Sequence, residues 1–113
     1  MTTPTEASET VDHSPSAEWM LDQFATSLTS SSSNTVVAYV SDVRQFAQWV
    51  ARQKIDTPHR VTKVQVRTYI GFLVTTKSAK RTVSRKLASL RKYFGWHVRR
   101  LASLRLKIGR AHV

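Results

Sequence analysis

The stretch that most directly indicates the fold is SAKRTVSRKLASLRKYF, residues 78–94. Its large apolar residues recur at intervals of three and four, which places them on one face of an α-helix, opposite a basic face. We therefore expect a long helix that is capped by Ser78 and bends or ends early at Gly95. The apolar face consists of Val83, Leu87, Leu90, Phe94 and Leu101, and the basic face of Lys80, Arg81, Arg85, Lys92 and Arg99.

Two earlier segments show the same helical spacing. Residues 16–28 predict a first helix that Ser14 or Ser16 can cap, and residues 34–53 predict a second one. Their apolar positions are Met20, Phe24 and Leu28 in the first, and Val36, Val40, Val43, Ala47 and Val50 in the second. The polar run 29–34 separates the two helices, and the Thr/Ser/Glu-rich residues 1–14 predict a disordered tail.

A third helix is expected to begin at Thr62. Thr62 and Gln65 have the spacing of a capping box, and Val61 and Val66 flank them at the positions of a hydrophobic staple. Four helices joined by short polar segments, with only three Gly and three Pro in the chain, argue against a sheet. The predicted fold is all-α, a four-helix orthogonal bundle over residues 15–98.

The composition excludes several functional classes. The 113 residues suffice for one domain, and the absence of Cys rules out disulfides and thiolate metal sites. No apolar run is long enough for a membrane span or a signal peptide, so we expect a soluble cytoplasmic protein with no membrane partner. The four His residues lack metal-ligand spacing, and no nucleotide-binding glycine motif occurs. We expect no cofactor, no metal and no catalytic site in this chain.

Charge is distributed unevenly along the chain. Residues 1–30 hold five acids and no Lys or Arg, whereas no acid follows Asp56 and fourteen Lys or Arg lie from Lys63 to Arg110. A formal net charge of +11 gathered in one half favours a polyanionic partner, above all double-stranded DNA. A solvated basic face, or a basic helix that contacts an acidic protein or a membrane surface, is the alternative.

Two helix starts are the candidate contact surfaces. Ser33, Asn34 and Thr35 lie at a predicted helix N-terminus, where free backbone N–H groups favour a phosphate. Arg81 and Arg85, with neighbouring lysines, follow the start of the long helix, and Arg there can contact guanine in a major groove.

Two motifs resemble the signatures of one protein family. Residues 33–46, SNTVVAYVSDVRQF, are similar to the first signature of the N-terminal core-binding domain of tyrosine recombinases, with the serine shifted by one residue. Residues 82–94, TVSRKLASLRKYF, resemble the second signature, with Ala88 and Ser89 transposed. Residues 61–73 resemble the helix between them, so the resemblance spans roughly residues 17–98.

The resemblance implies a SAM-like bundle that holds one face of a recombination site while a separate C-terminal catalytic domain holds the other. The second and fourth helices would approach the major groove, and other recombinase protomers would be partners on the DNA. For Asp42 and Arg91, a structural role fits the resemblance as well as a role in DNA binding does. The expected DNA-binding residues are Ser33, Asn34, Thr35, Tyr39, Lys80, Arg81, Thr82, Arg85 and Lys86.

The resemblance also implies what the chain itself does not do. The family cuts and rejoins DNA through a tyrosine nucleophile in the catalytic domain, and Tyr39, Tyr69 and Tyr93 do not correspond to it. The chain is therefore expected to bind DNA without being an enzyme, as the core-binding part of an integrase or Xer-type site-specific recombinase. The alternative DNA-binding function is that of a free-standing helix-turn-helix regulator.

The C-terminal residues are expected to be foreign to the domain. LASLR at residues 87–91 recurs at 101–105, and residues 108–113 match one reading frame of a common sequencing adapter. We treat residues 99–113 as a doubtful extension and the chain as a fragment of a longer recombinase.

Overall fold

The computed structural model describes residues 15–111, with side chains to residue 105, and these residues form helices and no strand. This confirms the predicted all-α class; the expected disordered tail, residues 1–14, lies outside the described part. The elements are the 3₁₀ turns η1 (Ala17–Trp19) and η2 (Pro58–Arg60), and the α-helices α2 (Leu21–Ser27), α3 (Ser33–Ala51), α4 (Lys63–Thr75) and α5 (Lys80–Ala111).

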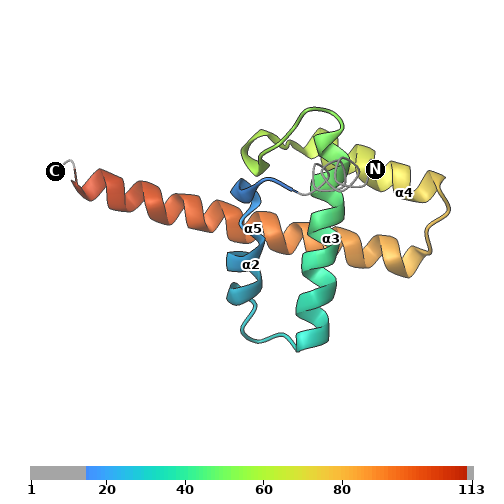
Figure 1. The fold of residues 1–113 in the computed structure, drawn as a ribbon, viewed down its shortest axis with the longest axis horizontal. Coiled ribbons are helices and arrows are strands. Elements are labelled where there is room, and N and C mark those ends of the chain that lie inside the picture. The colour runs from blue at the N-terminus through green and yellow to red at the C-terminus, as the bar shows by residue number, and fades with distance from the viewer. Residues whose placement is uncertain (1–14, 112–113) are drawn as a thin grey trace, which may run out of the picture.

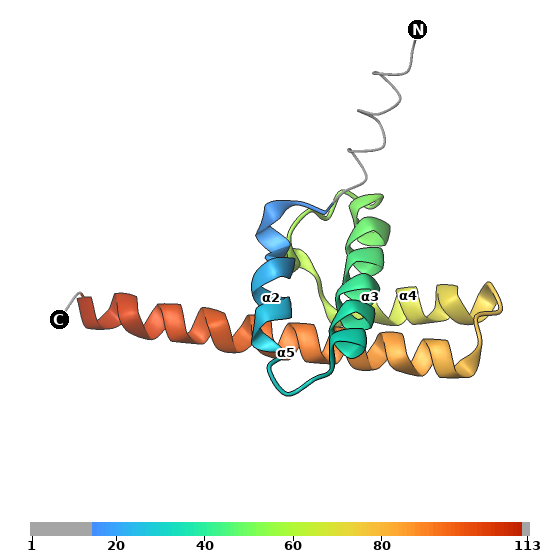
Figure 2. The same ribbon diagram turned by 60° about the horizontal axis from the view of Figure 1, so that its bottom comes forward.

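The helices form two side-by-side pairs, and one pair crosses the other (Figure 1). α2 lies along α3, α4 lies along α5, and α3 crosses the N-terminal half of α5, as Figure 2 shows from a second side. The C-terminal part of α5 extends beyond the other described helices. The arrangement is the orthogonal bundle expected from the sequence.

The core between the helices is largely aromatic. The rings of Trp19 and Tyr93 stack with centroids 5.6 Å apart, and Phe24 packs edge-on against Tyr93 at 5.2 Å. Phe46 packs edge-on against Tyr69 at 5.1 Å. Because these five side chains come from η1, α2, α3, α4 and α5, each of these elements is held by the same cluster.

The prediction of one continuous first helix was wrong. Met20 has a φ of 53°, in the left-handed region, and separates η1 from α2. This turn directs Trp19 into the core, where its indole N–H donates to the Asp56 carbonyl oxygen at 3.1 Å. The Tyr93 hydroxyl donates to the Trp19 carbonyl oxygen at 2.7 Å. These contacts with distant residues stabilise a bend that local helical spacing does not reveal.

The start of α4 confirms the predicted capping box. The Gln65 side-chain oxygen accepts from the Thr62 backbone N–H at 2.6 Å, and the Thr62 hydroxyl accepts from the Val64 N–H at 3.2 Å. At its other end α4 stops at Thr75, and the φ of 65° at Lys77 lets the Ser78 N–H return to the Leu73 carbonyl oxygen at 3.0 Å.

The long helix starts and ends later than the sequence suggests. Ser78 was expected to cap α5, but the Ala79 carbonyl oxygen accepts the first helical hydrogen bond, from the Val83 N–H. The helix does not end at Gly95, where an added Cβ would meet only the flexible end of the Arg99 side chain. Within the described residues no helix is both long and apolar enough to cross a membrane.

His97 lies inside the bundle without a hydrogen-bond partner for either ring nitrogen. It is 4% exposed, its ring stacks on that of Tyr93, and the ring of His59 lies 5.1 Å away. Burial, together with the charges of His59 and Arg100, holds the pKa of His97 below its ordinary value of 6.5. The neutral ring therefore fits the folded state.

We expect the stability of the domain to fall as the pH drops through about 6.5, because the unfolded chain then binds a proton that buried His97 refuses. One such proton changes the free energy of unfolding by at most about 1.4 kcal/mol per pH unit. Urea unfolding between pH 5 and 8 measures the slope. The slope of His97→Gln should be flatter, and an unchanged slope would show that His97 is not its source.

Candidate nucleic-acid interface

A buried carboxylate joins α3 to α5 where the two helices cross. Asp42 on α3 is 1% exposed and accepts hydrogen bonds from three side chains of α5. Arg85 donates from Nε at 2.9 Å and from Nη2 at 2.8 Å, and the Ser89 hydroxyl donates at 2.7 Å. Lys86 Nζ lies 3.4 Å from the carboxylate and donates to the Gln45 side-chain oxygen at 2.5 Å.

This network keeps Asp42 ionised. Burial alone would raise the pKa of Asp42, but the hydrogen bonds from Arg85 and Ser89 and the charge of Lys86 outweigh it. The pKa therefore lies below its ordinary value of 3.8. One negative charge faces two cations, so the crossing keeps a net positive charge.

The network holds Arg85 in a fixed position while leaving part of it free. Its side chain is 46% exposed, and Nε and Nη2 both point to Asp42. The remaining nitrogen, Nη1, is not used by the carboxylate. A guanidinium held in this way loses little entropy when it donates to a further acceptor.

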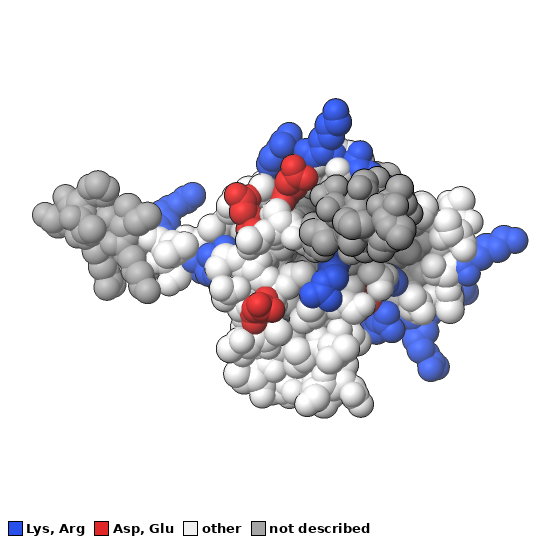
Figure 3. Space-filling view, viewed as in Figure 1, with Lys and Arg blue, Asp and Glu red and all other residues white. Residues whose placement is uncertain are grey.

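The two candidate surfaces of the sequence lie on two arms that diverge from Asp42. The N-terminal half of α3 forms one arm, and the N-terminal end of α5 forms the other (Figure 1). Figure 3, drawn from the same side, shows Lys and Arg atoms beside the α5 arm, a white surface over the N-terminal part of α3, and acidic atoms on the side of η1 and α2. The two surfaces thus border one angle that is basic on its α5 side, and we call it the α3–α5 angle.

On the α3 arm, Ser33 and Asn34 are exposed and Thr35 and Tyr39 are half-buried. The helix is capped by Ser32, whose hydroxyl accepts from the Thr35 N–H at 3.2 Å. First-turn N–H groups of a helix point outward, so Ser33 and Asn34 present donors to solvent. Tyr39 packs against the core instead and offers only part of its ring.

On the α5 arm, Lys80, Arg81 and Arg85 are exposed and Thr82 is half-buried. Lys86 lies elsewhere: its side chain is 8% exposed, and its ammonium group is used by Asp42 and Gln45. We therefore leave Lys86 out of the interface, because a phosphate could reach it only after the network opened. Its role as a DNA contact stays a prediction from sequence that this geometry does not favour.

Sequence reasoning missed Gln45 and Ser89, which complete the network around Asp42. One signal was available. Asp42 is the only acid between Asp22 and Asp56, and it adjoins Val43 on the apolar stripe of its helix. An acid on a buried face requires a cationic partner, and the long basic helix was the obvious source.

No metal centre accompanies the network. Within the described residues, no group of three or more His, Asp or Glu side chains is arranged to hold a metal ion.

Residues 21–101 match the family described as phage integrase, N-terminal SAM-like domain. The chain belongs to this family. The match confirms the resemblance to tyrosine recombinases that the two signatures carried. It includes both arms of the α3–α5 angle and the Asp42 network that joins them.

Similar curated proteins are tyrosine recombinases. The domain is 35% identical over 66 residues to tyrosine recombinase XerC of Listeria monocytogenes, which is 58% of this chain and 22% of that protein. It is 37% identical over 68 residues to XerC of Halalkalibacterium halodurans, 60% of this chain and 22% of that protein. It is 34% identical over 59 residues to XerD of Bifidobacterium longum, 52% and 19%. The aligned part is thus about a fifth of each relative, and no solved structure matches significantly.

We expect Asp42→Asn to lower the free energy of unfolding by about 3–5 kcal/mol, because it leaves the buried ammonium of Lys86 without a negative partner. The contribution of Asp42 is present at neutral pH and lost as the pH falls through its lowered pKa. Urea unfolding at pH 7 measures the change.

Asp56→Asn is the matched control, since this exposed acid forms no ion pair among the described residues. It should change stability by no more than about 0.5 kcal/mol. The double variant Asp42→Asn/Lys86→Met should lose less than the sum of its single variants. Simple additivity would contradict the coupling of the two charges.

Proposed function

We propose that this chain binds double-stranded DNA through the α3–α5 angle, as the core-binding part of a site-specific tyrosine recombinase. The observation that carries the proposal is the fixation of Arg85 by Asp42 at the helix crossing from which the two arms diverge. Membership of the integrase SAM-like family and the names of the similar proteins support it.

The dimensions of the angle suit a duplex. Ser33 lies nine residues before Asp42 and Lys80 five residues before Arg85, so the arms reach about 14 and 8 Å from the crossing. A major groove about 12 Å wide admits one α-helix, so it has room for the first turns of an arm. The short side chains on α3 would contact phosphates, and Arg85 would point Nη1 toward the base edges.

The charges around the angle support a polyanion over a protein partner. Both ion pairs of the described residues use Asp42, so Lys80 and Arg81 carry no acidic partner there. Exposed cations without partners release counterions from DNA when they meet phosphates. The chain would contribute binding, while cutting and rejoining by a tyrosine would belong to a catalytic domain of the full recombinase. Other protomers on the same DNA would complete the complex.

The affinity for duplex DNA should fall steeply with salt. If about five phosphates are contacted, log K against log salt has a slope of roughly −4 to −5. Lys80→Ala and Arg81→Ala should each make the slope shallower by about one. Arg52→Ala, at the opposite end of α3, is the control and should leave the slope unchanged. Fluorescence anisotropy of a labelled duplex measures these slopes. A wild-type slope near zero would contradict the proposal that the chain binds DNA.

Arg85→Lys should weaken base preference more than it weakens binding itself. Lysine keeps the charge but cannot hold Asp42 and a base edge at once, so we expect a loss of about 1–3 kcal/mol in discrimination. Competition between duplexes selected by the wild-type chain from a random pool and unselected duplexes measures it. Arg52→Lys, the same change at the opposite end of α3, serves as the control, and an equal loss on all sequences would limit Arg85 to phosphate contact.

A further inference from the structure

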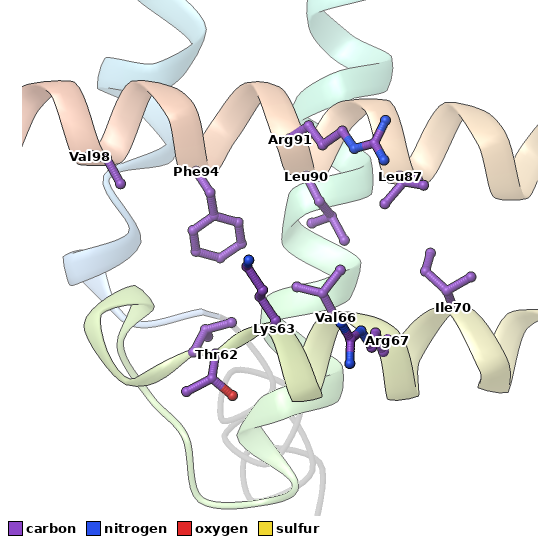
Figure 4. Close-up of a pocket in the computed structure, with 11 residues that line it drawn as sticks. Thr62, Lys63, Val66, Arg67, Ile70, Leu87, Leu90, Arg91, Phe94 and Val98 are labelled. Carbon is purple, nitrogen blue, oxygen red and sulfur yellow. The ribbon is translucent and has the colours of Figure 1, made fainter.

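α4 and α5 leave an open groove between them that the nucleic-acid interface does not use. Its volume is 760 Å³, and its floor is formed mainly by Val66 and Ile70 of α4 and Leu87 and Phe94 of α5. Figure 4 shows Leu90 pointing from α5 toward Val66 on α4, and Phe94 pointing toward Lys63 at the start of α4. We call this surface the α4–α5 groove.

The floor of the groove is not fully covered by the domain itself. Val66, Ile70, Leu87 and Phe94 are only half-buried, and Val98 at one end is 61% exposed. Contiguous apolar surface of this kind commonly marks a site of protein interaction. Burying it under a partner is favourable in proportion to the area removed from water.

The length of the groove suits a helix. Its residues on α5 run from Leu87 to Val98, eleven positions and about 16 Å along the helix axis. This is about three helical turns, the length over which an amphipathic helix presents anchors at i, i+3 or i+4, and i+7. A peptide that binds by β-strand addition would need a free sheet edge, which the described residues do not contain.

The rim of the groove determines the charge of the occupant. Lys63 and Arg67 of α4 and Arg91 of α5 line it, all three are exposed, and no acid is among the lining residues. Neither ion pair of the described residues involves these three side chains. Cations around an apolar floor attract a partner that places carboxylates beside its own apolar face.

We propose that the α4–α5 groove docks an amphipathic helix of a partner protein whose apolar face is flanked by Asp or Glu. The apolar anchors of that helix pack between Phe94 and Ile70. Its carboxylates pair with Lys63, Arg67 and Arg91.

The test uses the full chain and a labelled helical peptide of about 14 residues, with Leu at the anchor positions and Glu elsewhere. Two matched peptides have the same Leu positions with Lys for Glu, or the same composition with the Leu positions scrambled. Anisotropy titration should show the acidic amphipathic peptide binding at least about tenfold tighter than either. Equal binding of the scrambled peptide would overturn the proposal, because only charge would then be recognised.

Charge reversal on the rim locates the site without disturbing the floor. Lys63→Glu and Arg67→Glu should each weaken peptide binding about tenfold, whereas Lys77→Glu, the same change at an exposed lysine outside the groove, should change it less than about twofold. Thermal unfolding verifies that the variants fold. If Lys77→Glu weakens binding as much as the rim variants do, the proposal is wrong.

Two further measurements separate other occupants of the groove. If the rim variants weaken duplex DNA binding at least as much as they weaken peptide binding, the groove is a nucleic-acid surface and the proposal fails. If sedimentation shows that the chain self-associates and that Arg67→Glu abolishes this, a second copy is the occupant and the proposal also fails. Monomeric chains with unchanged duplex binding in the rim variants support the acidic helix.

Discussion

The structure depends most on one buried negative charge. A carboxylate removed from water is costly unless several donors replace the lost hydration. Asp42 meets this requirement with donors that all come from α5, more than forty positions later in the chain. The charge therefore fixes both the register and the crossing point of the two helices, which apolar packing alone would specify less strictly. The rest of the bundle, including the aromatic core, is arranged around this crossing.

The same carboxylate explains how the α5 arm can be so basic and still pack against α3. Without it, Arg85 and Lys86 would lie at the crossing with no negative partner, and their two positive charges would repel each other. With it, Lys86 is buried and paired with Asp42, and Arg85 keeps part of its side chain exposed to solvent. One ion-pair network thus separates the cations that stabilise the structure from those left for a partner.

Periodicity predicted the elements whose stability is local. α3, α4 and α5 each carry an apolar stripe over three or more turns, and the capping box at Thr62 marks a start that requires no distant contact. The first helix was misjudged because Met20, Phe24 and Leu28 imitate a continuous face. The bend at Met20 depends on Trp19, which bonds to Asp56 and Tyr93 far along the chain. Local spacing contains no information about such partners.

The candidate site could be predicted only in part, for the same reason. The exposed residues of the two arms follow from helix starts and charge, whereas the burial of Lys86 depends on the position of Asp42 across the helix crossing. Lys86 lies at the edge of the apolar stripe between Val83 and Leu90. From the sequence alone, a lysine at this position is as compatible with the surface as with the interior. Only the tertiary arrangement decides which lysine pairs internally and which faces solvent.

The geometry of α5 finally determines how its two surfaces relate to each other. Phe94 follows Arg85 by nine residues, which is about two and a half helical turns, so the two side chains leave the helix on opposite sides. Arg81 and Lys92 share the side of Arg85, while Leu87 shares the side of Phe94. α3 packs on α5 next to the side that carries Arg85, and α4 packs on α5 next to the side that carries Phe94. A duplex in the α3–α5 angle and a helix in the α4–α5 groove would therefore approach α5 from opposite directions. Neither would have to displace the other, and α5 would be the element that connects them.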